Sequence, residues 1–277
     1  MSELIGSYAR RLSRPLAGWP ARALVRHRPL FWLTGREVLR VLKLWTQTIA
    51  APVIASFLFI LVFGLSLGGR IKRIDGFSYD VFIVPGLITM AMVQAAYSNN
   101  SSSVFQARFD RYLHDVLAAP MRNWEVNLGL SLGGAVRALA IGLSLLGLSL
   151  LAVDVPIAQP GVLVLAVFLA LGLFSALGVV VGIYAVNFDH HTFVNNIIIL
   201  PLTFLGGVFY SVSRLPSPWQ EISHANPIFY LVSAVRYGFL GTADAPIGLA
   251  LGVTAVLALA AVGWSSWLFR TGRRLKA

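Results

Sequence analysis

Five stretches of the sequence carry no charged residue over more than 20 positions, and these runs limit the possible folds more than any other feature. They are residues 44–69, 81–107, 155–188, 190–213 and 245–269. A helix of about 20 apolar residues crosses the roughly 30 Å hydrocarbon core of a bilayer. Only 12% of all residues are charged, about half the usual share in a soluble domain. The sequence therefore predicts an all-α polytopic membrane protein and excludes an ordinary soluble enzyme.

We predict six transmembrane helices, because the segment before residue 155 is also apolar apart from the single charge of Arg137. The expected spans are residues 46–68, 81–104, 126–153, 160–186, 192–212 and 246–269. No remaining segment is long enough to form a separate soluble domain. The chain is thus expected to divide into a basic N-terminal segment (1–45), a transmembrane domain (46–269) and a basic tail (270–277).

The net charge of +11 follows the positive-inside rule and calls for no nucleic-acid partner. Sixteen Lys and Arg residues lie in the two termini and in the second and fourth loops, against five in the other loops. This bias predicts that both termini lie in the cytoplasm. The 43 residues before the first apolar run are too many for the start of a signal peptide, so we expect this segment to be retained.

The N-terminal segment contains a predicted amphipathic helix over 29–44, which we expect to begin after Pro29 and to lie in the membrane interface. Its polar positions at helical spacing are Arg36, Arg40, Lys43 and Gln47. Its apolar positions are Phe31, Val38, Val41, Leu42 and Trp45. The alternative is a cytoplasmic tail that its charge alone holds near anionic lipid.

The second loop contains another amphipathic segment, 108–120, which is too charged to span. Its apolar residues follow a helical repeat, and Pro120 ends the predicted helix. They are Phe109, Leu113, Val116 and Leu117. A short cytoplasmic helix of this kind either docks into a groove of a partner protein or rests on lipid head groups. Composition alone does not decide between the two.

The fifth loop predicts two short helices that are external or re-entrant, because the 14 uncharged residues between Glu221 and Arg236 are too few to span. Asn226-Pro227 is the expected break between them. Its aromatic residues suit the head-group level of a membrane. They are Trp219, Tyr230 and Tyr237.

Several kinds of chemistry lack their usual residues. The sequence has no GxxxxGK[ST], HExxH or GxSxG motif and no Cys, and no Asp or Glu lies inside the six predicted spans. Asp189, His190 and His191 come nearest to a metal site, but we interpret them as a polar turn. Arg137, alone inside a span, is a candidate site for an anionic head group or a dimer contact. The alternative role is to satisfy backbone carbonyls.

Two stretches resemble the permease subunit of bacterial ABC-2 type exporters, in particular the NodJ/YadH-like subgroup. The first contains Arg108, Asp110, Leu113, Leu117, Ala119 and Pro120. The second runs from Leu200 through Leu215-Pro216, Trp219, Ser223-His224 and Asn226-Pro227 to Gly241. The resemblance covers nearly the whole chain in order, apart from about the first 25 residues, to which we assign no role.

The resemblance implies a homodimer in the bacterial inner membrane, bound to two copies of a separate ABC ATPase that carries ATP and Mg²⁺. It implies no cofactor, metal or catalytic residue in this chain. The coupling helix seated in the ATPase would comprise Arg108, Phe109, Asp110, Arg111, Leu113, His114, Leu117 and Pro120. The external region over 215–241 would include Trp219, Asn226, Pro227, Arg236 and Tyr237. Candidates along a pathway lined mainly by spans one, two and five are Arg137, Phe204, Gly206, Gly207 and Tyr210.

We therefore expect an ATP-driven exporter subunit that is itself catalytically inert. Apolar walls with aromatic residues suit a lipid-linked, glycolipid or amphiphilic drug-like substrate. The alternative is a stand-alone secondary transporter or pore, which would work without any ATPase. An intramembrane enzyme would need a convergent set of Asp, Glu or His inside the spans, and the sequence contains none.

Overall fold

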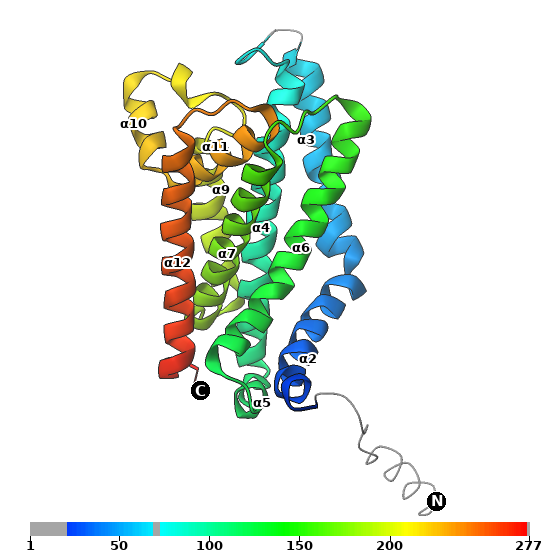
Figure 1. Ribbon diagram of the computed structural model, residues 1–277, viewed down its shortest axis with the longest axis vertical. Coiled ribbons are helices and arrows are strands. Elements are labelled where there is room, and N and C mark those ends of the chain that lie inside the picture. The colour runs from blue at the N-terminus through cyan, green and yellow to red at the C-terminus, as the bar shows by residue number, and fades with distance from the viewer. Residues whose placement is uncertain (1–20, 69–72, 276–277) are drawn as a thin grey trace, which may run out of the picture.

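The computed structural model describes residues 21–68 and 73–275, which form a bundle of helices (Figure 1). In chain order the elements are α2 (Ala21–Lys43), η1 (Thr46–Ala50), α3 (Ala51–Gly68), α4 (Tyr79–Phe109), α5 (Leu113–Ala118), α6 (Asn123–Ala152), α7 (Pro160–Tyr184), α8 (Phe188–Phe193), η2 (Val194–Ile199), α9 (Leu200–Leu205), η3 (Val212–Arg214), α10 (Ser217–Ala225), α11 (Pro227–Leu240) and α12 (Ile247–Thr271). Extended pairing in these ranges is limited to one isolated bridge between Ile74 and Phe77. The all-α prediction is confirmed. Predictions that concern residues 1–20, Arg70, Lys72 and Lys276 lie outside the described residues.

Five helical segments are long and apolar enough to cross a membrane, which confirms the polytopic class. They are Thr46–Gly64, Tyr79–Phe109, Asn123–Ala152, Pro160–Tyr184 and Ile247–Thr271. The expected span at 192–212 differs from the structure, which has a helical run of three joined segments, α8, η2 and α9, that ends at Leu205. The helix ends there because Gly207 adopts a φ of 81°, which glycine tolerates and a continuing helix does not. That this run is a sixth span stays a prediction.

Helix α4 is the centre of the bundle. In its apolar window 78% of the residues are buried, against 11% in the window of Thr46–Gly64. Helices α6 and α7 approach α4 closely because glycine faces it from both: a Cβ on Gly134 would lie 2.7 Å from the carbonyl oxygen of Ala96, and one on Gly178 would lie 2.5 Å from that of Tyr97. The side chain of Asn100 ties the three helices together.

The side chain of Asn100 both donates and accepts hydrogen bonds. Its Nδ2 donates to the carbonyls of Ser131 on α6 and Ser175 on α7, each at 3.2 Å, and its Oδ1 accepts from the amide of Gly134 at 2.9 Å. In a membrane, polar side chains of this kind turn toward neighbouring helices because lipid offers them no hydrogen bonds.

Helices α4 and α6 are longer than the spans predicted within them. With 31 residues, α4 extends about 46 Å at 1.5 Å per residue. The extra turns contain Asp80 at the start of α4 and Glu125 at the start of α6. The spans were predicted to contain no acidic residue, and these two lie in the first turns, where a helix of this length reaches beyond hydrocarbon.

The bundle has two distinct ends. Figure 1 shows α5, the start of α2 and the C-terminal end of α12 together at one end, which we call the α5 end. Helices α10 and α11 lie at the opposite end, near the end of α3 and the start of α4, which we call the α11 end. The predicted pair of short helices is present there, with its break at Asn226.

Helix α2 is amphipathic, but it begins at Ala21 and contains Pro29, so its predicted start after that proline is wrong. Pro29 is the ninth residue of this helix, where a proline costs one backbone hydrogen bond and favours a kink. Leu33 and Val41 are buried against the bundle. Phe31, Trp32, Leu39, Leu42 and Trp45 are exposed on the outside. The outer apolar stripe is the surface that an interfacial helix would turn to lipid.

Candidate functional site

The segment predicted as one coupling helix is divided in two by a turn. Helix α4 continues to Phe109, the chain turns through Asp110 and Arg111, and α5 begins at Leu113. Arg111 has a φ of 62°, a left-handed conformation that interrupts a helix. The helical repeat from Phe109 to Leu117 was therefore wrong as a description of one continuous helix.

This turn separates the predicted coupling residues into inward and outward groups. Leu113 is only 1% exposed and packs in the core, whereas Phe109 is 75% exposed. Arg108 also points inward, where Nη1 donates to the carbonyls of Ile183 (2.5 Å) and Ala185 (3.1 Å) at the end of α7. Among the predicted coupling residues, Leu117 is half-buried, and the exposed ones are Phe109, Asp110, Arg111, His114 and Pro120.

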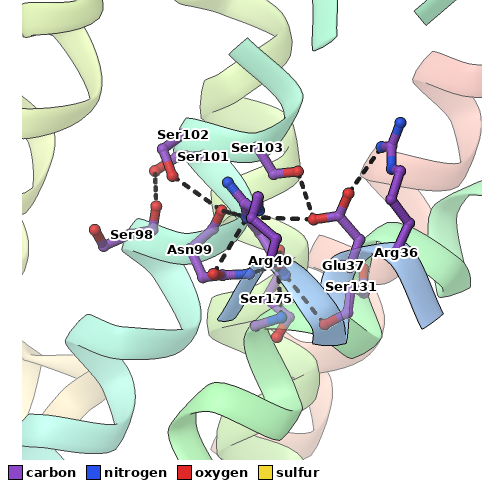
Figure 2. Close-up of polar contacts among 12 residues, drawn as sticks. Arg36, Glu37, Arg40, Ser98, Asn99, Ser101, Ser102, Ser103, Ser131 and Ser175 are labelled. Atoms are coloured by element: carbon purple, nitrogen blue, oxygen red, sulfur yellow. Dashed lines mark hydrogen bonds and ion pairs between the residues drawn. The ribbon is translucent and has the colours of Figure 1, made fainter. Parts of the chain in front are cut away.

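A buried carboxylate joins α2 to α4 close to this turn, and Figure 2 shows its partners. Glu37 is 1% exposed; its Oε2 accepts from the hydroxyl of Ser103 at 2.7 Å. The same carboxylate pairs with Arg36 at 2.8 Å and with Arg40 at 3.2 Å. Arg40 in turn donates to the carbonyl and side-chain oxygens of Asn99, both at 3.2 Å. A buried charge is stable only when paired in this way.

The Glu37 cluster extends to the turn before α5. The guanidinium carbon of Arg36 lies 4.6 Å from the centre of the Tyr112 ring, a cation–π contact. Burial raises the pKa of the Tyr112 phenol, so this side chain stays neutral at physiological pH. These contacts therefore connect helix α2 both to the segment of α4 around Asn99 and Ser103 and to the turn before α5.

At mid-depth in the bundle, Arg137 borders a cavity of about 260 Å³. It stands midway along α6 and its Nε donates to the carbonyl of Thr48 in the π-helical segment η1 at 2.9 Å. The cavity is formed by α3, α4, α6 and η2. Its polar lining residues are Ser56, Gln94, Ser98, Arg137 and Asn195, and its apolar ones include Pro52, Phe59, Leu87 and Met90.

A cluster of four phenylalanines begins at the wall of this cavity. Phe59 stacks on Phe63 with ring centres 5.8 Å apart, and both contact Phe209. Phe204 stacks on Phe209 at 5.5 Å. The cluster joins α3 to the end of α9. Polar groups at mid-depth thus continue into an aromatic surface nearer the α11 end.

The coupling segment, the cavity and the phenylalanine cluster all lie in the part of the sequence that is similar to known proteins. A family profile described as ABC-2 type transporter matches residues 28–240, from α2 to the end of α11. The chain belongs to the ABC-2 type transporter family. It is the transmembrane permease of an ABC transporter, a multi-pass inner-membrane protein that works with an ABC ATPase subunit.

Relatives match the permease over most of its length. The inner membrane transport permease YadH of Escherichia coli K12 is 39% identical over 255 residues, which cover 90% of this chain and 99% of the relative. Nodulation protein J of Rhizobium meliloti is 24% identical over 265 residues, covering 94% and 96%. Nodulation protein J of Sinorhizobium fredii is 27% identical over 200 residues, covering 71% and 75%.

The α11 end of the permease contains a second buried ion pair. Arg236 is 1% exposed; its Nη1 contacts Asp244 at 2.9 Å and its guanidinium lies 4.1 Å from the centre of the Phe82 ring. Its Nη2 donates to the carbonyl of Gly207, and Ser211 donates to Asp244. This pair fixes the turn after α9 against α11.

The remaining predicted residues have local roles in the same region. Asn226 caps α11 by accepting from the amide of Ile228 at 3.0 Å and ties α11 to α9 through the carbonyl of Leu202. Pro227 is the first residue of α11, Trp219 is exposed and Tyr237 is half-buried.

The predicted pathway residues separate into two places. Arg137 lines the mid-depth cavity, and Phe204 lies in the aromatic cluster beside it. Gly206 and Gly207 form the buried turn after α9, and Tyr210 packs beside Val212 and Phe229. The last three are therefore part of the α11 end and do not line the cavity.

Sequence reasoning missed Glu37 and Asp244, the carboxylates that pair with arginines, and the polar residues Gln94 and Asn195 that line the cavity beside Arg137. Signals exist for Glu37 and for its polar partners on α4. The predicted second span contains six consecutive polar residues, Ser98–Ser103, which lipid would not accommodate. Glu37 lies four residues from both Leu33 and Val41, on the buried stripe of α2.

Proposed function

We propose that the permease exports an amphiphilic molecule, such as a lipid-linked sugar, a glycolipid or a drug-like compound, from the cytoplasmic side outward. A separate ATPase, present in two copies with ATP and Mg²⁺, drives the movement, and this chain itself catalyses no reaction. The observation that carries the proposal is the cavity beside Arg137, whose polar mid-depth lining continues into the phenylalanine cluster. A polar pocket next to an aromatic surface suits a substrate with both kinds of surface.

A second copy of the permease completes this pathway in our proposal. One of the helices that border the cavity, α3, lies in the least buried of the five apolar segments. If lipid covered this face, the polar groups of the cavity would meet hydrocarbon, which is costly. A homodimer through this face encloses the cavity between two protomers, in agreement with the cyclic symmetry usual for homo-oligomers.

The α5 end supports the proposed contact with the ATPase. Phe109 is a large exposed apolar residue beside the charged groups of Asp110 and Arg111 and the imidazole of His114, a mixture typical of docking surfaces. A movement of α5 and the preceding turn would be transmitted to α4 through the chain itself and to α2 through the contacts of Arg36 and Glu37. The positive-inside count favours the cytoplasm for this end, where α2 and the end of α12 also lie.

Co-purification of the permease with its ATPase tests the proposal. We expect the wild-type chain to retain a stoichiometric ATPase whose hydrolysis vanadate inhibits. The triple variant Phe109→Ala, Arg111→Ala, His114→Ala should lose at least about 90% of it, because these residues are exposed and leave the core intact. Leu113 is unsuitable for this test, because its burial makes any substitution a folding variant.

The matched control is Trp219→Ala, which removes an exposed aromatic residue at the α11 end. It should retain the ATPase fully. Retention by the triple variant would refute the docking surface. Substrate movement by the purified chain in liposomes without any ATPase would instead establish a stand-alone transporter or pore.

A further inference from the structure

We propose that the mid-depth cavity is a binding site for the anionic head group of an amphiphile, with Arg137 as the residue that recognises its phosphate or carboxylate. The inference rests on the proposed function and specifies its substrate class. Arg137 has hydrogen-bond donors that no described residue accepts from. Of its three nitrogens, only Nε has a partner, the carbonyl of Thr48. The terminal nitrogens Nη1 and Nη2 donate to no described residue, neither is fully buried, and Arg137 lines the cavity.

No carboxylate among the described residues pairs with Arg137. Over residues 21–68 and 73–275, the described ion pairs do not include Arg137. Arg40, a charged group that acts electrostatically on Arg137, is also cationic and is already paired with Glu37. The surroundings of the cavity are therefore positive, because two arginines share one carboxylate in the Glu37 cluster and Arg137 adds a third positive charge.

A second permease copy cannot supply the missing carboxylate at this depth. In a symmetric dimer, the surface that faces the cavity is the same surface of the other copy. The apolar stretches 46–68 and 190–213, which form this face through α3, η1, η2 and α9, contain no Asp or Glu. The acidic residues of α4 and α6 lie in their first turns, Asp80 and Glu125, far from the midpoint of either helix. A ligand is then the remaining source of a counter-charge.

Other groups in the cavity also lack partners. Nε2 of Gln94 and Oδ1 of Asn195 are buried and make no hydrogen bond in the described part of the chain. Both residues line the cavity together with Arg137. Buried polar atoms without partners are rare in folded proteins, and a ligand is one explanation for them. The amide of Gln94 would add a donor for the anion, while Asn195 would accept from a hydroxyl of the same head group.

The cavity also defines where the rest of the ligand lies. A volume of about 260 Å³ holds a head group and its first methylenes, but no complete lipid. Apolar side chains of Phe59, Leu87 and Met90 also line the cavity, and an alkyl chain would contact them. The π-helical segment η2 contributes Asn195 to the cavity, and the π-helical segment η1 accepts the hydrogen bond of Arg137 at Thr48. Such segments frequently occur at functional sites.

Binding of tritiated dodecyl phosphate to the full-length permease in dodecyl maltoside tests the inference. The micelle supplies a large excess of neutral amphiphile, so saturable binding reports recognition of the charged head. We expect Arg137→Gln to weaken binding at least about 10-fold and Arg137→Lys to stay within about threefold, since a lysine keeps the charge. The matched control, Arg214→Gln, removes an exposed arginine of the α11 end and should bind like the wild type.

Three results would overturn the inference. The first is unchanged binding by a folded Arg137→Gln variant. The second is competition by inorganic phosphate as strong as that by unlabelled dodecyl phosphate, which would reveal an ion site without an amphiphile. The third applies if Arg137→Gln does not fold: Gln94→Leu, which keeps the charge and removes one donor, should weaken binding about threefold or more, and unchanged binding would overturn the site.

The same samples separate this inference from the proposed function. If Arg137 controls dodecyl phosphate binding but no ATPase associates with the permease, the site stands and ATP-driven export fails. If the permease–ATPase complex transports substrate with ATP while Arg137→Gln binds dodecyl phosphate normally, export stands and the anion site fails.

Discussion

Two arginines within the bundle, the buried Arg236 and the half-buried Arg137, have opposite environments. At the α11 end, Arg236 has a carboxylate at 2.9 Å, a carbonyl of Gly207 and the face of Phe82. At mid-depth, Arg137 has one carbonyl, that of Thr48, and borders a cavity. The first arginine has a carboxylate partner within the fold, although its Nε is buried without a hydrogen bond to a described residue. The second has no carboxylate partner among the described residues, and both of its terminal nitrogens lack a hydrogen bond there.

The difference separates a structural charge from a functional one. Removing one member of a closed buried pair leaves the other charged and unpaired, so the pair is essential to the fold. An arginine at mid-depth without a carboxylate is a cost to the fold, and its presence needs a reason other than stability. Substitutions of the two kinds of charge should therefore differ in their effect on stability.

Arg236→Met should destabilise the permease most, by about 3–5 kcal/mol, because it leaves Asp244 buried without its counter-ion. Thermal unfolding in detergent, followed by tryptophan fluorescence, measures the loss. Arg214→Gln breaks an exposed pair with Asp75 at 3.6 Å and should change stability by less than about 1 kcal/mol. Equal effects of the two variants would contradict the structural role of Arg236.

Glu37→Ala should cost about 2–3 kcal/mol, since it removes charge-assisted bonds from Arg36, Arg40 and Ser103 at once. We also expect the amides of α2 to lose protection in hydrogen exchange, because this carboxylate fastens α2 to α4. Glu221→Ala, an exposed glutamate on α10, is the control and should leave α2 protected. Unchanged protection in Glu37→Ala would show that apolar packing alone holds α2.

Arg137→Gln should change stability by less than about 1.5 kcal/mol, the net value of a single hydrogen bond to a carbonyl. The same unfolding assay as for Arg236→Met gives the comparison directly. A loss as large as that of Arg236→Met would place Arg137 among the structural charges and remove the contrast.

The smallest effect concerns pH and involves neither arginine. Burial lowers the pKa of His191, with the nearby Phe188 backbone and Asp189 acting in the opposite direction. The unfolded chain then binds a proton near pH 6.5 before the folded chain does, so stability is complete above that value and falls as pH drops below it. We expect a loss of less than about 1 kcal/mol between pH 7.5 and 5.5. In His191→Gln this pH-dependent loss should be absent, and an identical pH profile would assign it to another group.

The helical class and the short helices were predictable from the sequence, because they depend on local patterns. Runs without charge predicted the long helices, and Asn226-Pro227 predicted the break between α10 and α11, since an asparagine cap and a first-turn proline act within a few residues. The turn at Arg111 was not predictable in this way. An arginine rarely adopts a positive φ, and the apolar repeat around it suggested an unbroken helix.

The class of this protein follows from the sequence alone, because long apolar runs must form helices across a membrane and their order places the amphipathic segments. The partners of the charges inside the bundle depend instead on tertiary packing. Glu37 accepts from Ser103, 66 positions away, while among the described residues Arg137 donates to Thr48 alone, 89 positions away. Such pairings depend on how helices rotate and approach each other, which small residues such as Gly134 and Gly178 permit. The sequence shows which charges enter the membrane region, and packing decides which of them remain available for a ligand.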